Sequence, residues 1–388
     1  MIELVMLFLL PVAAASGWFA ASKESRRRAS RVSGFNSDYF KGLNYLLNEQ
    51  PDKAIEIFIK MVEVDRDTVE THLALGHLFR RRGEVDRAIR IHQNLIARPK
   101  LDPNIRMLAL LELGEDYMKA GLFDRAENLF HELIEMNEHT ARALVHLRDI
   151  YQQEQDWEKA IETSRKLEQT NHRSMHPMIA QYYCELAEKC LKANDLKAAA
   201  KEVHKALQQD KKCVRASILQ AQIDTRNSNF KAAISAYTNV VNQDIDYLPE
   251  IIDELSECHR KTDTEKSLME FLQEILKRYN GISPMLALAG LIREQRSERE
   301  AMEFVIEHLR KRPSVKGLNW LIGLSLQHSQ GEARKNLMIL YDLTNKLLEN
   351  KPIYGCHVCG FSGKVLHWQC PSCKAWNSVK PIQGLEGE

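Results

Sequence analysis

The chain has 388 residues and a formal net charge of +1, because 54 Lys and Arg nearly balance 53 Asp and Glu. This balance argues against a strongly basic nucleic-acid binder and against an acidic interaction tail. The length exceeds one compact core of ordinary size, and only 17 glycines and 11 prolines are present. We therefore expect a helical protein with several domains or an extended repeat.

The first predicted element is a transmembrane anchor at residues 1–21. From Ile2 to Ala21 the sequence is mostly Leu, Val, Phe and Ala, with Glu3 as its one charge. About twenty helical residues span the hydrocarbon core of a bilayer. A cleaved signal peptide is the alternative, but such a peptide carries its basic residues before the apolar stretch. Here they follow it, in a linker at 22–34, and by the positive-inside rule they keep the rest of the chain in the cytoplasm.

The next predicted element is an array of about six helical hairpins over residues 35–245. Six alanines recur at spacings of 34, 38, 34, 39 and 34 residues: Ala54, Ala88, Ala126, Ala160, Ala199 and Ala233. Three glycines precede the first three alanines at a constant distance: Gly42, Gly76 and Gly114. We expect these small residues where helices approach each other closely. The period resembles tetratricopeptide repeats, although the early Trp of that family is missing and its closing Pro is largely absent.

Beyond these hairpins, residues 246–350 keep a helical pattern without the diagnostic small residues. Pro249–Ile275, Pro284–Leu309 and Ser314–Leu348 each read as a helical pair. We interpret them as degenerate repeats that close an all-α superhelix. Four cysteines scattered along the array are interpreted as small buried hydrophobic residues: Cys184, Cys190, Cys213 and Cys258.

A candidate partner-binding site lies in the second hairpin. His77, Arg80 and Arg81 fall near the end of a first helix, where tetratricopeptide repeats line their concave surface. These residues could receive an acidic segment of a partner, and an ordinary charged turn is the alternative. Catalytic motifs are missing: there is no Gly-rich phosphate loop, and the helix that carries His131 has Glu135 where a zinc protease needs its second His. We therefore expect a protein that is not an enzyme.

The last predicted element is a metal-binding domain at residues 351–388. Two Cys-x-x-Cys pairs, separated by ten residues, are typical of a tetrahedral four-thiolate site, whose ligands here are Cys356, Cys359, Cys370 and Cys373. Two disulfides are the alternative, but they do not suit a reducing compartment. His357 and His367 are close in sequence but are not needed, since four cysteines complete the shell. The tail resembles rubredoxin-like and zinc-ribbon knuckles, and we favour one zinc ion over iron.

So small a domain cannot stabilise itself by burial alone. It is unusually rich in aromatic residues, which include Tyr354, Phe361, Trp368 and Trp376. We expect them to pack on the last helical repeats and to fix the end of the array.

Anchor, repeat array and metal knuckle together resemble the lipopolysaccharide assembly protein B family of Gram-negative inner membranes. The stretches Leu10–Ala15, Arg82–Gln93, His367–Cys373 and Lys380–Ile382 carry this resemblance. It implies a non-enzymatic, single-pass adaptor of the inner membrane with its bulk on the cytoplasmic side. Its implied partners are a membrane AAA protease of the FtsH type, the deacetylase that commits carbon to lipid A, and other lipopolysaccharide biosynthesis proteins. The resemblance implies that the adaptor controls degradation of this deacetylase by the protease.

Two other classes of protein stay open. The first is a structural assembly factor that gathers lipopolysaccharide enzymes at the membrane without a protease. The second is a metal-dependent RNA-binding or redox protein. The near-neutral charge opposes RNA binding, so no nucleic-acid partner is expected.

Overall fold

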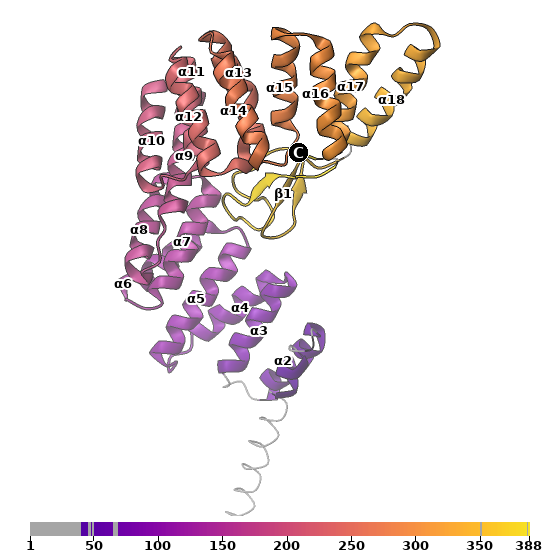
Figure 1. Cartoon of the computed structure of the whole chain (residues 1–388). Coiled ribbons are helices and arrows are strands. Elements are labelled where there is room, and N and C mark those ends of the chain that lie inside the picture. The colour runs from indigo at the N-terminus through magenta and orange to yellow at the C-terminus, as the bar shows by residue number, and fades with distance from the viewer. Residues whose placement is uncertain (1–39, 46–47, 49, 65–68, 350, 386) are drawn as a thin grey trace, which may run out of the picture. The chain divides into compact units, whose positions relative to one another are not determined.

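The computed structural model describes every residue except 1–39, 46–47, 49, 65–68, 350 and 386 (Figure 1). The predicted anchor at 1–21 and the linker at 22–34 therefore lie outside the described residues. Within the described part of the chain, every helix is too short or too polar to cross a membrane.

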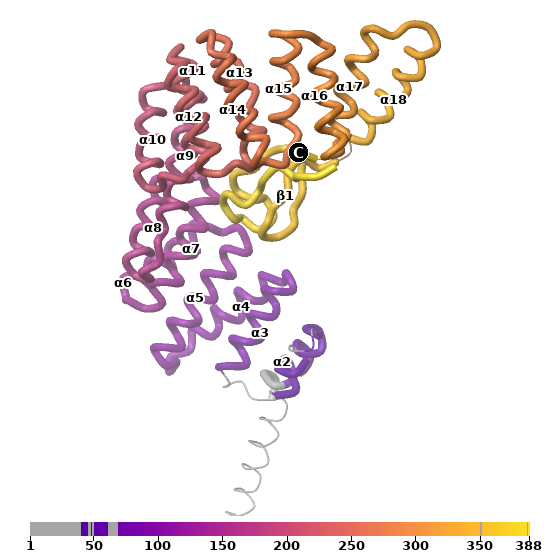
Figure 2. The backbone as a smooth tube through the Cα atoms, in the orientation of Figure 1, coloured from indigo at the N-terminus to yellow at the C-terminus, as the bar shows by residue number. Residues whose placement is uncertain are grey.

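The chain divides into two compact units, Met1–His172 and Arg173–Glu388, and each is built from helical hairpins. In the first unit, residues 40–45 are helical, and successive helices pack against one another in chain order (Figure 2). The helices of this unit are α2 (Pro51–Val64), α3 (Val69–Arg82), α4 (Val85–Ile96), α5 (Pro103–Lys119), α6 (Phe123–Glu135), α7 (Thr140–Glu154) and α8 (Trp157–Asn171).

The second unit continues the same hairpin design and ends in a small sheet. Its helices are α9 (His176–Lys192), α10 (Leu196–Gln209), α11 (Val214–Arg226), α12 (Phe230–Gln243), the 3-10 helix η1 (Ile245–Glu250), α13 (Ile252–Lys261), α14 (Glu265–Arg278), α15 (Ser283–Gln295), α16 (Glu298–Lys311), α17 (Val315–His328) and α18 (Gly331–Glu349). The strands are β1 (Tyr354–Cys356), β2 (Ser362–Gly363) and β3 (Val379–Pro381), in the order β2-β1-β3. Both strand pairs are antiparallel, with Tyr354 opposite Gly363 and Pro381.

The turn between the two helices of a hairpin repeats with the period of the sequence. One residue in this turn has a positive φ in successive hairpins: Gly83 (88°), Gly121 (74°), Gln155 (59°), Asn194 (60°), Ser228 (59°) and Asp263 (51°). Glycine suits this backbone conformation best, and the other residues adopt it at a small cost. The turn at Asp263 shows that the hairpin geometry continues beyond the point where the sequence pattern fades.

Aspartates begin several of the helices. Asp102 accepts hydrogen bonds from the backbone N–H groups of Asn104 and Ile105, and Pro103 occupies the first turn of α5. Asp156 and Asp195 cap α8 and α10 in the same way. Such caps satisfy backbone donors that a helix cannot pair internally.

The small residues of the repeat occupy tight helix contacts, as the sequence predicted. All six marker alanines, from Ala54 to Ala233, are fully buried. A Cβ atom built on Gly114 would lie 2.5 Å from the ring of Phe130 on the paired helix α6. Gly42 and Gly76 meet the rings of Phe58 and His92 in the same manner. In these three hairpins the glycine therefore leaves room for a ring of the paired helix.

We expect Gly114→Ala to lower the free energy of unfolding of the first unit by about 1–3 kcal/mol, because the new methyl group must displace a buried ring. Gly290→Ala is the matched control, since a Cβ atom there has nothing within 4 Å and α15 should gain slightly from alanine. Hydrogen exchange of the α5 and α6 amides would measure the loss. Equal protection in Gly114→Ala and in the unaltered chain would contradict this account.

One hydrophobic core of the second unit runs from α11 to α16. Its fully buried side chains include Tyr237, Leu248, Leu255 and Leu272. Leu366 and Trp368 from the sheet-bearing segment pack against this core. The small sheet is thus seated on the helices of the second unit.

A candidate metal centre and its seat on the helical repeats

The metal-binding segment, here called the ribbon (residues 354–381), is built from two similar knuckle turns. In the first, Cys356 N–H donates to the Phe361 carbonyl at 2.7 Å, and Gly360 N–H donates to the Cys356 carbonyl at 3.0 Å. In the second, Cys370 N–H donates to Ala375 and Lys374 N–H donates to Cys370, both at 2.9 Å. Gly360 and Lys374 hold the equivalent positive-φ position. Each turn thus folds its Cys-x-x-Cys pair around one point.

The two turns bring all four cysteine sulfurs together. The Sγ atoms of Cys356 and Cys373 are 3.8 Å apart, and those of Cys359 and Cys370 are 3.6 Å apart. All four sulfurs lie within 4.8 Å of one another. Four ligands placed 2.3 Å from a tetrahedral ion stand about 3.8 Å apart, so the spacing fits one thiolate-bound ion. Zinc and iron both adopt this geometry with four thiolates.

Charge at the four sulfurs also favours a cation. The Ser378 hydroxyl lies 3.3 Å from the sulfur of Cys356 and lowers the pKa of that thiol to about 6. At Cys373 the Ala375 backbone amide acts to lower the pKa, but burial and the three other sulfurs outweigh it and raise the pKa to about 12. The Cys356 thiol therefore loses its proton readily, whereas the Cys373 thiol keeps its proton. A bound divalent ion supplies the positive charge that lets all four be thiolates together.

Two tryptophans of the ribbon pack on tyrosines of the helices. Trp368 stacks on Tyr247 of η1, with ring centroids 5.3 Å apart and planes inclined by 21°. The Tyr247 hydroxyl donates to the Val379 carbonyl of β3 at 3.2 Å, so this buried ring holds the ribbon at two points. Trp376 meets Tyr182 of α9 edge-on, with ring centroids 5.9 Å apart. Aromatic pairs in these arrangements contribute stability beyond their buried area.

Arg215 of α11 lies beneath both tryptophans. Its guanidinium is 5.7 Å from the ring centroid of Trp368 and 6.0 Å from that of Trp376. Glu185 and Glu188 of α9 accept hydrogen bonds from it at 2.7–2.9 Å. The side chain is almost wholly buried, so the paired carboxylates balance a charge that would otherwise be costly.

Polar contacts complete the seat around η1. Lys380 of β3 forms ion pairs with Asp244 at 2.6 Å and with Asp246 at 3.0 Å. The Tyr354 hydroxyl donates to Glu250 at 2.7 Å, and Gln181 of α9 donates to Asn377 at 3.1 Å. The ribbon is therefore held by matched charges and hydrogen bonds as well as by stacked rings.

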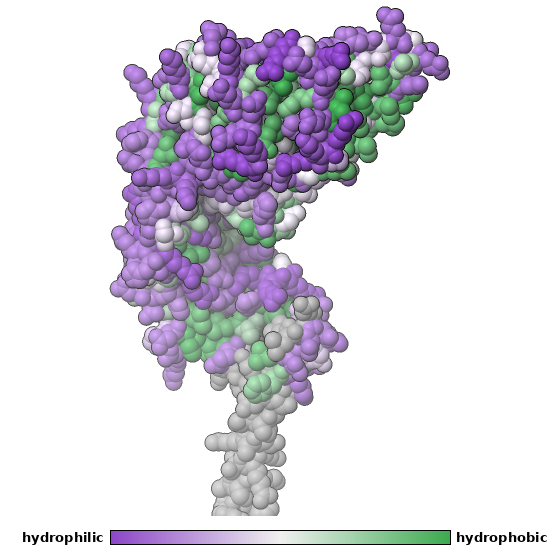
Figure 3. Space-filling view, in the orientation of Figure 1, coloured by the Kyte–Doolittle hydropathy of each residue, from purple (hydrophilic) through white to green (hydrophobic). Residues whose placement is uncertain are grey.

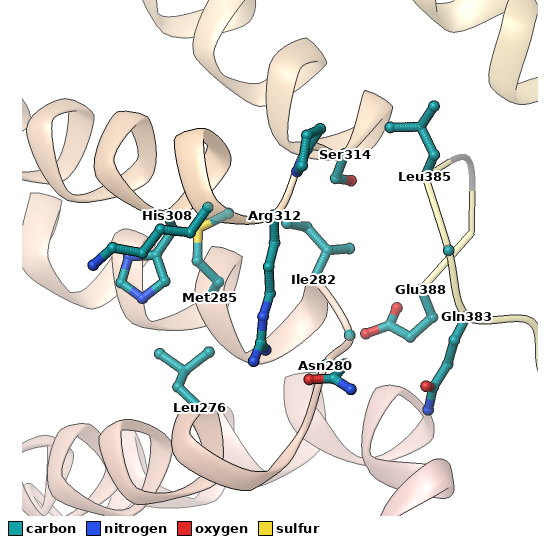
Figure 4. A pocket seen from close by; sticks show the side chains of 14 residues that line it. Leu276, Asn280, Ile282, Met285, His308, Arg312, Ser314, Gln383, Leu385 and Glu388 are labelled. Carbon is teal, nitrogen blue, oxygen red and sulfur yellow. The ribbon is translucent and has the colours of Figure 1, made fainter.

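The segment after β3 extends the contact to α15 and α17. The Glu388 carboxylate accepts hydrogen bonds from the Ser283 N–H and hydroxyl at 2.7 and 2.6 Å, at the start of α15. Val315 N–H donates to the Leu385 carbonyl at 2.9 Å. A pocket of about 600 Å³ lies beside this segment. Figure 4 shows the Glu388 carboxylate turned toward the loop between α14 and α15, which carries Asn280 and Ile282.

The seat differs from the sequence-based expectation in its position. The aromatic residues were expected to pack on the last repeats, but Trp368 and Trp376 contact α9, α11 and η1. Phe361 packs inside the ribbon with Tyr354 and Leu366. The helix-side residues of the seat were not singled out by sequence reasoning; they are Tyr182, Arg215, Asp244, Asp246 and Tyr247. The one signal in the sequence was the short acidic and aromatic stretch of η1, which interrupts the regular hairpins.

The candidate partner residues of the first unit separate into different environments. Arg80 is buried, and its guanidinium forms ion pairs with Glu112, Glu115 and Asp116 at 2.6–2.9 Å. His77 and Arg81 are exposed and line a groove of about 290 Å³ between α3 and α5. Arg80 therefore braces the wall of the groove, while His77 and Arg81 face its opening.

The carboxylates around Arg80 form a charged cluster. Burial alone would raise the pKa of Glu115, but His146, Arg80 and Arg142 outweigh burial and lower the pKa to about 2. Glu115 is thus ionised across the physiological range. It accepts hydrogen bonds from Arg142 at 2.9 Å and His146 at 3.0 Å, both on α7, so the cluster links α3, α5 and α7.

Fold and site together define a helical-repeat scaffold with a four-cysteine metal ribbon seated on its second unit. Models of the tetratricopeptide repeat match residues 71–106 and 111–171, and a rubredoxin metal binding domain matches residues 354–381. A solved structure of the C-terminal part of a tetratricopeptide-repeat protein from Cytophaga hutchinsonii is 14% identical. That match covers 69% of this chain and 98% of the other, with a TM-score of 0.40.

Curated relatives match the whole chain, and two of them represent different organisms. A protein of Escherichia coli (strain K12) is 36% identical over 389 residues, with 100% of both chains covered. A protein of Haemophilus influenzae is 33% identical over 396 residues, again with 100% of both chains covered. Both are named lipopolysaccharide assembly protein B. The chain belongs to the lipopolysaccharide assembly protein B family, which confirms the resemblance found in the sequence.

Proposed function

We propose that this chain is a non-enzymatic adaptor for lipopolysaccharide biosynthesis, tethered to the inner membrane by residues 1–21, with its bulk on the cytoplasmic side. In this proposal it presents the deacetylase that commits carbon to lipid A to a membrane AAA protease of the FtsH type. The name of its relatives supports a role connected with lipopolysaccharide, and the repeat fold supports binding of protein partners.

The groove of the first unit is the observation that carries this proposal. In the described part of the chain, Arg81 has no ion pair, whereas its neighbour Arg82 pairs with Asp52 and Glu84. Leu73 and Leu108 line the same groove and supply apolar surface. An exposed cation beside apolar residues fits a partner segment that combines a carboxylate with a hydrophobic side chain.

We further propose that Cys356, Cys359, Cys370 and Cys373 hold one zinc ion, with iron as the alternative. A closed shell of four thiolates leaves no coordination position open for a substrate, and zinc has no redox chemistry, so with zinc the role of the ion is structural. Its function is to keep the ribbon folded on its seat. The ribbon then covers Tyr182, Arg215 and Tyr247 and sets the shape of the second unit.

The groove can be tested in cells with the full chain. We expect Arg81→Glu to slow the degradation of the deacetylase at least about threefold, because the reversed charge repels an acidic segment. Arg90→Glu is the matched control, since Arg90 is an exposed arginine on the paired helix α4 and does not line the groove. The half-life of the deacetylase, followed after synthesis is stopped, is the measurement. Unchanged turnover in Arg81→Glu would remove the groove from the adaptor mechanism.

A structural assembly factor is the second candidate, because the same groove could gather biosynthetic enzymes. A photo-crosslinker placed at His77 separates the two functions. Two results together would favour assembly: crosslinks to the deacetylase persist in cells that lack the protease, and the Arg81→Glu substitution leaves the turnover of the deacetylase unchanged. Crosslinks to the deacetylase together with slowed turnover would favour the adaptor.

A further inference from the structure

The last helix of the second unit carries a hydrophobic face that no other part of the described chain covers. Besides Met338 (54%), four of its apolar side chains are about half exposed: Ile339 (58%), Leu340 (49%), Leu343 (53%) and Leu347 (52%). We call these four residues the α18 stripe. Figure 3 shows hydrophobic residues gathered over α17 and α18 on the visible face.

The α18 stripe is distinct from the face that packs on α17. Thr344 is the buried residue of α18, and its hydroxyl donates to Asn319 of α17 at 2.7 Å. The ring of Tyr341 lies against Gly323 of the same helix. Helical repeats that end in solvent need a polar outer face. The outer face of α18 is apolar instead, which indicates that another helix belongs there.

The spacing of the stripe suits pairing with a helix. Leu340, Leu343 and Leu347 are three and then four residues apart, as in the seam of two packed helices. Covering the stripe and its borders on two copies removes roughly 1,000 Å² from water, which is the area of a weak but biological interface.

The charges of α18 favour a second copy of this chain over a membrane surface. The helix carries three acidic residues (Glu332, Asp342 and Glu349) and three basic residues (Arg334, Lys335 and Lys346), so its net charge is zero. A helix that lies on anionic lipid carries an excess of Lys and Arg on its polar face. Neutral α18 has no such excess.

The order of the charges is self-complementary in an antiparallel pair. With Leu343 near a two-fold axis, Lys346 comes within about two residues of Asp342 on the other copy. The same arrangement places Lys335 close to Glu349 of the other copy. Within the described part of the chain, none of these four side chains forms an ion pair, so all four are available.

We propose that two copies of this chain pair through their α18 stripes, antiparallel and two-fold symmetric about Leu343. The interface places the leucines at its centre and the ion pairs Lys346–Asp342 and Lys335–Glu349 at its rim. This inference rests on α18 alone and does not depend on the partner of the first unit.

Sedimentation of the purified full chain in mild detergent tests the pairing. We expect a dimer for the unaltered chain, and for Leu343→Glu a dissociation constant at least about a hundredfold higher, because two carboxylates would meet in an apolar contact. Leu343 is half exposed in one copy, so helix content should not change. Met136→Glu is the matched control, as Met136 is a similarly exposed residue of the first unit (48%) and should leave the dimer intact.

Charge reversal tests the antiparallel arrangement. Lys346→Asp alone and Asp342→Lys alone should each weaken the dimer about tenfold, and the double variant should recover it, because the pairs re-form across the axis. If the unaltered chain is a monomer at about 100 µM, which corresponds to less than about 5.5 kcal/mol of association free energy, the proposal is wrong. It is also wrong if the Leu343→Glu protein sediments as the unaltered chain does. A monomer whose binding to anionic vesicles is lost in Leu343→Glu would likewise overturn the proposal, since the stripe would then face a membrane.

Discussion

Replacing Cys370 with serine is expected to release the metal ion and to unfold the ribbon. A structural four-thiolate site contributes about 10 kcal/mol or more of binding free energy, and in a domain this small that energy is the folding energy. Cys370 is fully buried and lies 3.6 Å from the sulfur of Cys359. A serine hydroxyl at this place neither ionises readily nor reaches the ion as sulfur does. We therefore expect loss of the bound ion and of the seat together.

Metal content by mass spectrometry and limited proteolysis at Lys364 and Lys374 measure this effect. Cys190→Ser is the matched control, because Cys190 is a half-buried free cysteine of α9 that takes no part in the cluster. It should keep one ion per chain and resist the protease. A Cys370→Ser protein with full metal content and normal protease resistance would show that these four sulfurs do not hold the ion.

Trp368→Ala is expected to detach the ribbon from the helices while leaving its metal ion in place. The substitution removes the stack on Tyr247 and one of the two rings above Arg215. Large aromatic truncations at well-packed contacts cost about 3 kcal/mol or more. The knuckle turns and the four sulfurs do not involve the Trp368 side chain, so the ion should remain bound.

Hydrogen exchange of the amides in η1 and β3 reports the detachment. We expect faster exchange in both elements in Trp368→Ala, with one ion per chain retained. Val365→Ala is the control, since Val365 is an exposed residue of the same ribbon (64%) and its truncation should change stability by no more than about 0.5 kcal/mol. Slow exchange in Trp368→Ala, as in the unaltered chain, would mean that the stack does not hold the ribbon.

Periodicity predicted the helical hairpins because their contacts are local. Gly114 and Ala126 lie on the two helices of one hairpin, only twelve residues apart. The recurrence of such alanines about every 34 residues therefore indicates which positions must be small in each hairpin. The close spacing of the two Cys-x-x-Cys pairs likewise predicted the cluster of sulfurs that the structure brings together. In both cases the relevant residues are near each other in sequence.

The seat of the ribbon could not be predicted in this way. Gln181 and Asn377, which form one hydrogen bond, are separated by 196 residues, and Tyr354 and Glu250 by 104. No spacing rule links such positions, because the curvature of the intervening helices decides whether they meet. The arginines of α3 show that sequence position alone does not predict burial even for adjacent residues. Arg80 and Arg81 are neighbours in sequence, but about 100° of helical rotation turns one into the interior and the other toward solvent.

The late position of the ribbon in the sequence sets an order of events during synthesis. The helical surface that the ribbon covers is synthesised well before the ribbon itself; it includes Tyr182, Arg215 and Tyr247. This surface is therefore exposed to solvent until Trp368 and Trp376 have been made. Contacts between such distant residues also form slowly. A nascent chain that has not yet reached the ribbon therefore displays an uncovered aromatic surface, which is buried only when the ribbon folds onto it.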